Sequence, residues 1–239
     1  PLEAPEEYIH ARLDLKERLY PETPYLDDSW LAFDPRVTWL EKMLKQLRPA
    51  KVLVICAHAS TAVALEHHLH LRAGIRSSAF YEGLSIIERD RAAAYFADEV
   101  NGAQTLVCSE IGSEGRNFQF SHHLILFDLP MNPDLLEQRI GRLERIGQQC
   151  DIDIHVPYLA KTAQQSLFEW YDQGLNLFRD SCSAGYMIFE MFQDRLLSEL
   201  EQRTETFDTL LTDSAVFTAK TRQELRDGRD KLLERNSCK

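Results

Sequence analysis

Residues 132–148 read N-P-D-L-L-E-Q-R-I-G-R-L-E-R-I-G-Q, and the interpretation of the whole chain depends on this stretch. Asn132 can cap a helix, Pro133 suits its first position, and Gly147 suits its end. We therefore expect one helix across the stretch. Apolar residues recur in it at i, i+4 and i+7, which predicts a buried stripe of Leu136, Ile140 and Leu143.

Polar residues follow the same spacing on the other side of this expected helix. Gln138, Arg142 and Arg145 lie roughly 200° around the axis from the stripe, so they point away from the core together. Two guanidiniums one helical turn apart form a rigid fork for phosphate oxygens. Gly141 inside the helix costs roughly 1 kcal/mol relative to alanine, which indicates a close approach by another group. The alternative is a solvated basic face on a surface helix.

Composition limits the class of protein. A chain of 239 residues, 44% of them apolar, forms one or two domains with a full core. The net charge of −11 argues against general adhesion to nucleic acid, so any such contact must be local. No apolar run approaches membrane-spanning length and no signal peptide opens the chain, so we expect no membrane contact. The chain does not begin with Met, which favours an excised or processed fragment.

Cysteine and histidine give no metal or disulfide pattern. The five cysteines, at positions 56, 108, 150, 182 and 238, form no C-x-x-C pair, which suits a reducing cytoplasm. His67, His68 and His70 share one expected helix, but no third ligand cluster accompanies them, so a zinc site is not favoured. Glu110 and Glu114 could pair as hydrolase carboxylates, but nothing supplies the second half of such a site.

Short apolar runs alternate with helical patterns through the middle of the chain. The expected strands are residues 51–56, 76–81, 105–108, 124–127 and 153–156. Helical patterns lie between them, including residues 85–97, where Glu88 is placed for a capping box. This alternation predicts a parallel sheet covered on both faces, which is a three-layer α/β/α lobe.

The lobe divides the chain into three regions. Five prolines interrupt residues 1–35, which we expect to form an arm or linker with one charged helix at 6–19. Residues 36–159 form the lobe. Residues 160–239 contain no strand pattern and form a helical appendage, with a last charged helix at 221–235.

Three loops that follow expected strands carry polar residues or glycine. Ligands of open parallel sheets bind at such loops, beyond the carboxyl ends of the strands. The richest is S-E-I-G-S-E-G-R-N-F at 109–118, where Gly112 and Gly115 allow close approach of the backbone. Ser109, Glu114 and Asn117 offer side-chain hydrogen bonds there. The other two loops are residues 80–91 and 128–133.

These motifs resemble, in order, the second lobe of superfamily-two helicases and translocases. Q-R-I-G-R-L-E-R-I-G-Q at 138–148 is similar to their last motif, and its R-I-G-Q ending is typical of the Swi/Snf type. Four further stretches match the earlier motifs of this lobe. They are the strand at 51–56, the series Gly83, Arg89 and Phe96, the loop at 109–118, and Asp128 followed by N-P. The resemblance covers about residues 36–158, with Ser113 a departure where many Swi/Snf proteins carry glycine. The sequences at 109–120 and 128–148 are more specific still. They resemble those of the bacterial RNA polymerase-associated Swi/Snf-type ATPases.

The resemblance implies a RecA-like motor lobe of a DNA-dependent ATPase that translocates on double-stranded DNA and assists polymerase recycling in transcription. Arg142 and Arg145 would act as arginine fingers on ATP, held with Mg²⁺ by a first RecA-like lobe, and Gln138 would orient the site. Glu114, Gly115 and Asn117 would bind the cofactor. Arg89, Ser109 and Arg116 would contact the nucleic-acid backbone. The implied partners are RNA polymerase, duplex DNA and the first lobe.

Two other functions remain open. An RNA helicase lobe belongs to the same superfamily, although the R-I-G-Q ending and the Asp128-x-x-x-Asn132-Pro133 spacing favour a DNA translocase. The second is a catalytically idle module that docks a large protein through its acidic helical tail. The chain lacks G-x-x-x-x-G-K-[ST], so we expect no ATPase activity from it alone.

Overall fold

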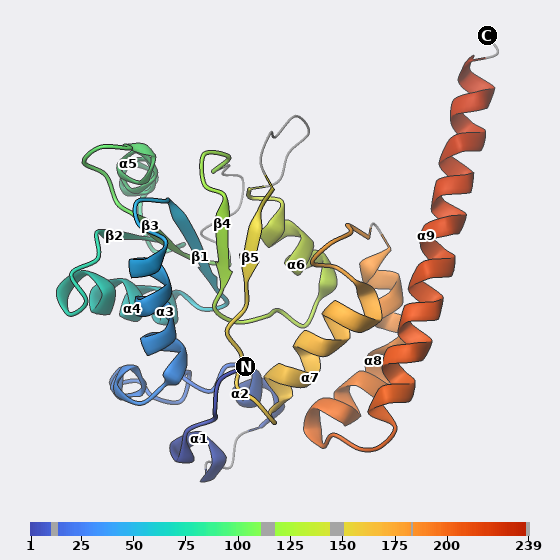
Figure 1. Cartoon of the computed structure of the whole chain (residues 1–239), viewed down its shortest axis with the longest axis horizontal. Helices are drawn as coiled ribbons and strands as arrows, with labels where there is room; N and C mark the ends of the chain where they lie inside the picture. The colour runs from blue at the N-terminus through green and yellow to red at the C-terminus, as the bar shows by residue number, and fades with distance from the viewer. Residues whose placement is uncertain (11–13, 111–117, 144–150, 183, 238–239) are drawn as a thin grey trace.

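A computed structural model describes residues 1–10, 14–110, 118–143, 151–182 and 184–237 (Figure 1). Its centre is a five-stranded sheet in the order β2-β3-β1-β4-β5, with every neighbouring pair parallel. The strands are β1 (Val52–Cys56), β2 (Ser77–Phe80), β3 (Thr105–Ser109), β4 (His123–Leu126) and β5 (Asp153–His155). The prediction of a parallel sheet is confirmed, and each predicted strand is present.

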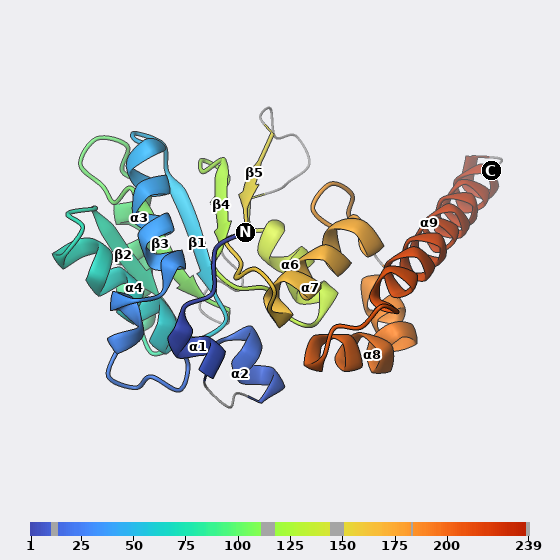
Figure 2. The ribbon, with the colours of Figure 1, turned by 60° about the horizontal axis from the view of Figure 1, so that its bottom comes forward.

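Helices cover both faces of this sheet, as predicted. Alternate residues of a strand point to opposite faces. Val52 and Val54 pack against α3 (Pro35–Gln46) and α4 (Ala59–Leu71), with which they share one core. Leu53 and Ile55 belong to a second core with α5 (Ile86–Ala97) and α6 (Pro133–Ile140). Figure 2 shows α3 and α4 beside β2 and β3, and α6 and α7 near β4 and β5.

Helix α5 begins as its sequence predicts. The Ser85 hydroxyl accepts a hydrogen bond from the Glu88 backbone N–H, and the Glu88 carboxylate accepts one from Ser85 N at 2.8 Å. This is a capping box, which satisfies two backbone donors that the first turn leaves free. It fixes the chain direction just after the loop at 81–84.

The first 35 residues form short helices that pack against the lobe. These are α1 (Glu6–His10), α2 (Leu15–Leu19) and the 3₁₀ helix η1 (Ser29–Ala32). One helix across 6–19 is wrong, because Asp14 has extended backbone and caps α2 by accepting from Glu17 N at 2.9 Å. Leu19 and Trp30 are buried in the two cores. The boundary near residue 35 remains a prediction.

The C-terminal region is helical, with α7 (Ala163–Glu169), a π-helix η2 (Trp170–Leu175), α8 (Gly185–Glu201) and α9 (Phe207–Ser237). Helix α9 begins well before the predicted start at Thr221, and Figure 1 shows its far end projecting from the body. The first half of α9 packs on η2 and α8. Among the described residues, no helix is long and apolar enough to cross a membrane.

Candidate functional site

Polar residues at the carboxyl edge of the sheet connect the loops that follow four of the strands. Beyond β4, the Asp128 carboxylate accepts a hydrogen bond from Ala57 N, just after β1, at 2.9 Å. At the end of β3, the Ser109 hydroxyl donates to the Glu82 carboxylate, in the loop after β2, at 2.5 Å. Both Asp128 and Ser109 are buried. The predicted ligand-binding edge is therefore organised by bonds between loops.

Arg139 is the central cation of this edge, although it was not among the predicted site residues. Its guanidinium is buried and donates to the Asp128 carboxylate at 3.1 Å, to the Asp128 carbonyl at 2.7 Å and to the Glu110 carboxylate at 2.5 Å. Burial opposes the charge, but the two carboxylates raise the pKa of Arg139 above the ordinary value of an arginine. A signal was present in the spacing, because Arg139 follows Leu136 by three residues and precedes Leu143 by four, on the apolar stripe.

The helix that carries Arg139 begins as predicted but ends early. Asn132 accepts a hydrogen bond from Asp134 N at 2.9 Å and Pro133 takes the first position, so the predicted cap is confirmed. All three stripe residues, Leu136, Ile140 and Leu143, are buried, as predicted.

One continuous helix from 132 to 148 is wrong, because α6 ends at Ile140 with Gly141 as its C-cap. Arg142 N and Leu143 N donate to carbonyls only three residues back, those of Arg139 and Ile140, which is the tighter spacing of a turn. Glycine has a low helix propensity, and this favours the end of the helix there. Residues 144–150, with Arg145 and Gly147, lie outside the described residues.

Gln138 and Arg142 therefore do not share one helical face. Gln138 is exposed on α6, whereas Arg142 is half-buried in the turn that follows. The Nε of Arg142 is buried and finds no hydrogen-bond acceptor among the described residues. Its positive charge acts on the Cys108 thiol at the end of β3, although burial outweighs it and raises the pKa of Cys108. Arg142 thus carries an unsatisfied donor near the carboxyl edge, which suits an anionic oxygen.

Arg89 and Ser109 meet at one residue, Glu82. The Arg89 guanidinium donates to the Glu82 carbonyl at 2.9 Å and to the Leu84 carbonyl at 3.0 Å, while Ser109 bonds to the Glu82 carboxylate. Arg89 is only partly buried, so it fixes the loop and still faces solvent. The other candidates of the 109–118 loop, Glu114, Gly115, Arg116 and Asn117, lie outside the described residues.

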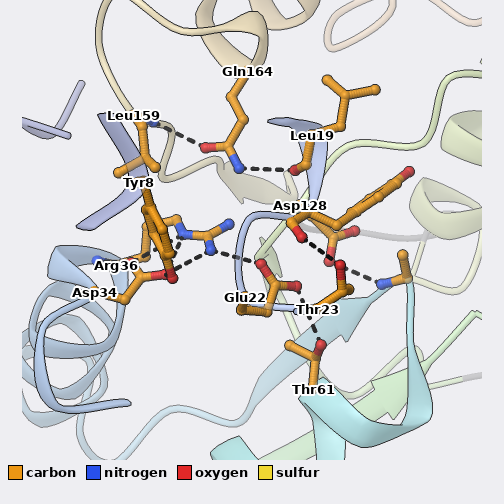
Figure 3. Close-up of polar contacts among 12 residues, drawn as sticks. Tyr8, Leu19, Glu22, Thr23, Asp34, Arg36, Thr61, Asp128, Leu159 and Gln164 are labelled. Atoms are coloured by element: carbon orange, nitrogen blue, oxygen red, sulfur yellow. Dashed lines mark hydrogen bonds and ion pairs between the residues drawn. The ribbon is translucent and has the colours of Figure 1, made fainter. Parts of the chain in front are cut away.

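A second buried network, also missed from the sequence, fastens the N-terminal segment to the lobe (Figure 3). The Arg36 guanidinium donates to Glu22 at 2.8 Å and to Asp34 at 2.6 Å, and all three side chains are buried. Tyr8 donates to Asp34 at 2.9 Å, and Thr61 of α4 donates to Glu22 at 3.2 Å. Burial raises the pKa of Glu22, although Arg36 opposes this shift. Residues 1–35 are thus joined to α3 and α4 by charged hydrogen bonds.

One of the three histidines on α4 pairs with an acid of a neighbouring helix. His68 Nε2 lies 2.7 Å from a carboxylate oxygen of Glu41 on α3, which makes an interhelical pair. Among the described residues, no three His, Cys, Asp or Glu side chains gather in a way that could hold a metal ion.

Two families match the chain in succession. The helicase conserved C-terminal domain matches residues 35–147, and the C-terminal region of the RNA polymerase recycling family matches residues 151–239. The RNA polymerase-associated protein RapA of Pseudomonas putida is 54% identical over 245 residues, which cover 99% of this chain and 26% of that protein. RapA of Stutzerimonas stutzeri is 54% identical over 246 residues, with the same coverage of both chains.

Solved structures share the fold at low sequence identity. The C-terminal part of the Fun30 ATPase domain superposes with a TM-score of 0.53 at 19% identity, covering 72% of this chain and 57% of that one. The C-terminal domain of the DEAD-box protein Dbp5 gives 0.50 at 20% identity, covering 61% and 79%. The predicted RecA-like helicase fold is therefore confirmed.

Proposed function

We propose that this chain is the second motor lobe of an ATP-driven DNA translocase, because it is 54% identical to the RNA polymerase-associated protein RapA of Pseudomonas putida, of whose length it spans 26%, and matches the helicase C-terminal and RNA polymerase recycling families in succession. The proposal depends most on the position of Arg142. This residue is half-buried close to the carboxyl edge, where α/β sheets bind ligands, and its Nε has no hydrogen-bond acceptor in the part of the chain that the structure describes.

ATP with Mg²⁺ supplies the phosphoryl group and its counter-charge, and we assign the holding of both mainly to the first RecA-like lobe. This chain contributes hydrogen-bond donors to the phosphate oxygens of ATP. Arg142 offers a guanidinium whose Nε finds no acceptor among the described residues, and this fits a phosphate oxygen. Arg145 is proposed as the second finger from its spacing alone. Gln138, exposed on α6 one turn before Arg142, is proposed to orient the site.

The loops at 82–84 and 109–118 are proposed to contact nucleic acid and nucleotide. Arg89 and Ser109 both bond to Glu82, which joins the 82–84 loop to the end of β3. We assign Arg89, Ser109 and Arg116 to the DNA backbone, and Glu114, Gly115 and Asn117 to the cofactor. Residues 151–239 are proposed to associate with RNA polymerase, which implies a role in transcription and a cytoplasmic location.

The test is a steady-state ATPase assay of the full-length protein with saturating duplex DNA. Arg142→Ala and Arg145→Ala should each lower kcat on the order of a thousandfold, since an arginine finger stabilises charge on the transferred phosphoryl group. ATP affinity should change little, because that charge develops mainly in the transition state. Arg145→Lys should recover little activity, because an ammonium cannot reproduce the planar fork of donors.

Arg195→Ala is the matched control, since Arg195 is an exposed arginine of the appendage that pairs with Asp213 at 2.8 Å. It should keep the wild-type kcat. Loss of activity in only one of the two finger variants assigns the role to that arginine alone. Full activity in both identifies the segment as a solvated basic face. Stimulation by RNA rather than duplex DNA would favour the RNA helicase alternative.

A further inference from the structure

The loop between β4 and α6, residues 127–132, leads directly into the helix that precedes Arg142, and hydrogen bonds from three regions hold it. From the lobe, Ala57 N donates to Asp128. From the N-terminal segment, the Tyr20 hydroxyl donates to the Leu129 carbonyl at 3.2 Å. From the appendage, the Tyr171 hydroxyl donates to the Pro130 carbonyl at 2.6 Å. The last of these bonds is the shortest.

Tyr171 is suited to hold the loop permanently. Its side chain is fully buried between the appendage and the lobe, and burial raises the pKa of its phenol well above the ordinary value. The hydroxyl therefore stays protonated and donates at any working pH. Tyr171 belongs to the π-helix η2, a rare geometry that is frequent at functional sites.

Helix α6 is itself seated against the appendage. The Glu137 carboxylate of α6 accepts a hydrogen bond from Cys182 N, just before α8. At the start of α6, Pro133 lies against Gly185, where an added Cβ would be 3.0 Å from the Pro133 Cβ. A helix of 8 residues is a rigid rod about 12 Å long. A shift of the loop at its start is therefore transmitted to the turn at its end.

We propose that Tyr171 is a positioning residue of the motor site: its hydroxyl fixes the β4–α6 loop, and the loop with α6 fixes where Arg142 lies. This inference rests on the proposed function of Arg142. It gives the helical appendage a direct part in ATP turnover, through one hydrogen bond to the backbone of the motor lobe.

Tyr171→Phe in the full-length protein tests the proposal, because it keeps the ring and removes the donor. We expect kcat at saturating ATP and duplex DNA to fall by about tenfold, since misplacement by roughly 1 Å can cost on the order of a hundredfold. The KM for ATP should change little, because the first lobe holds most of the nucleotide. Gly185→Ala should also lower kcat, because its methyl group displaces the start of α6. This variant keeps the hydrogen bond between the Tyr171 hydroxyl and the Pro130 carbonyl.

Ser214→Ala is the matched control. The Trp170 indole donates to the Ser214 hydroxyl at 3.0 Å, so this variant removes a buried bond of the appendage that does not reach the loop. It should lower the melting temperature about as much as Tyr171→Phe and keep the wild-type kcat.

The kcat values of the three variants separate the positioning role from the role of Arg142. Wild-type kcat in Tyr171→Phe overturns the positioning role, as does an equal loss of kcat in Ser214→Ala, which would show general loosening. If Arg142→Ala loses activity while Tyr171→Phe does not, only the positioning role fails. If Arg142→Ala itself keeps the wild-type kcat, the proposed role of Arg142 fails instead.

Discussion

Arg139 places a positive charge inside the lobe, where its donors reach the carboxylates of Asp128 and Glu110. Removing the cation takes away the ion pairs of the buried Asp128 and the half-buried Glu110 with Arg139. We therefore expect Arg139→Met to lower the free energy of unfolding of this chain by about 3–5 kcal/mol, the usual cost of breaking a buried ion pair. Urea denaturation followed by circular dichroism measures the change.

The control for Arg139 is Arg179→Ala. Arg179 pairs with Asp172 at 2.8 Å, but its side chain is 68% exposed, so solvent screens the pair. Its loss should cost at most about 1 kcal/mol. Equal, small losses in both variants would show that the charges of Asp128 and Glu110 are satisfied without Arg139.

Residue-level roles were only partly predictable. An arginine on an apolar stripe needs a buried carboxylate as its partner. This rule identifies Arg139 as a buried cation, but it does not identify the acidic residues with which Arg139 pairs. Asp128 and Glu110 lie 11 and 29 residues away along the chain, so their pairing with Arg139 depends on the order of the strands. The proposed roles of Gln138, Arg142 and Arg145 remain predictions.

At the scale of single elements, the strands were predictable because buried parallel strands appear as short apolar runs. Helix starts were predictable where a cap lies next to its donor in sequence, as at Ser85 and Asn132. Helix ends were not. The apolar stripe of α6 continues to Leu143, in the turn after the helix. The spacing of apolar residues therefore does not show where the helix ends. The early start of α9 was hidden because Ser214 and Thr218 are buried polar residues that interrupt its apolar face.

The cap of α6 gives a test at this scale. Asn132→Ala removes the acceptor of Asp134 N and should lower the free energy of unfolding by about 1 kcal/mol. Asn132→Ser keeps a side-chain oxygen and should retain most of the stability. Urea denaturation of both variants measures the difference. If alanine and serine behave alike, water satisfies this end of the helix and the side chain is dispensable.

At the scale of the molecule, the N-terminal segment and the appendage both pack on the motor lobe, and local sequence patterns gave no sign of this. The contacts join residues far apart in the chain, such as Tyr20 with Leu129 and Tyr171 with Pro130. An arm rich in proline and a lobe-bound segment have the same local signals. Only the partners across the fold distinguish them.

The isolated chain of 239 residues should fold but not hydrolyse ATP. Both faces of its sheet are covered by complete apolar cores, so it should unfold cooperatively on heating. It should nevertheless hydrolyse ATP no faster than background with duplex DNA, because it has no phosphate-binding G-x-x-x-x-G-K-[ST] loop. Arg142→Ala in the same isolated chain distinguishes its own activity from a contaminant's, since a contaminating ATPase is unaffected by the change. DNA-stimulated turnover that disappears in Arg142→Ala would mean that this chain is a complete enzyme rather than half of one.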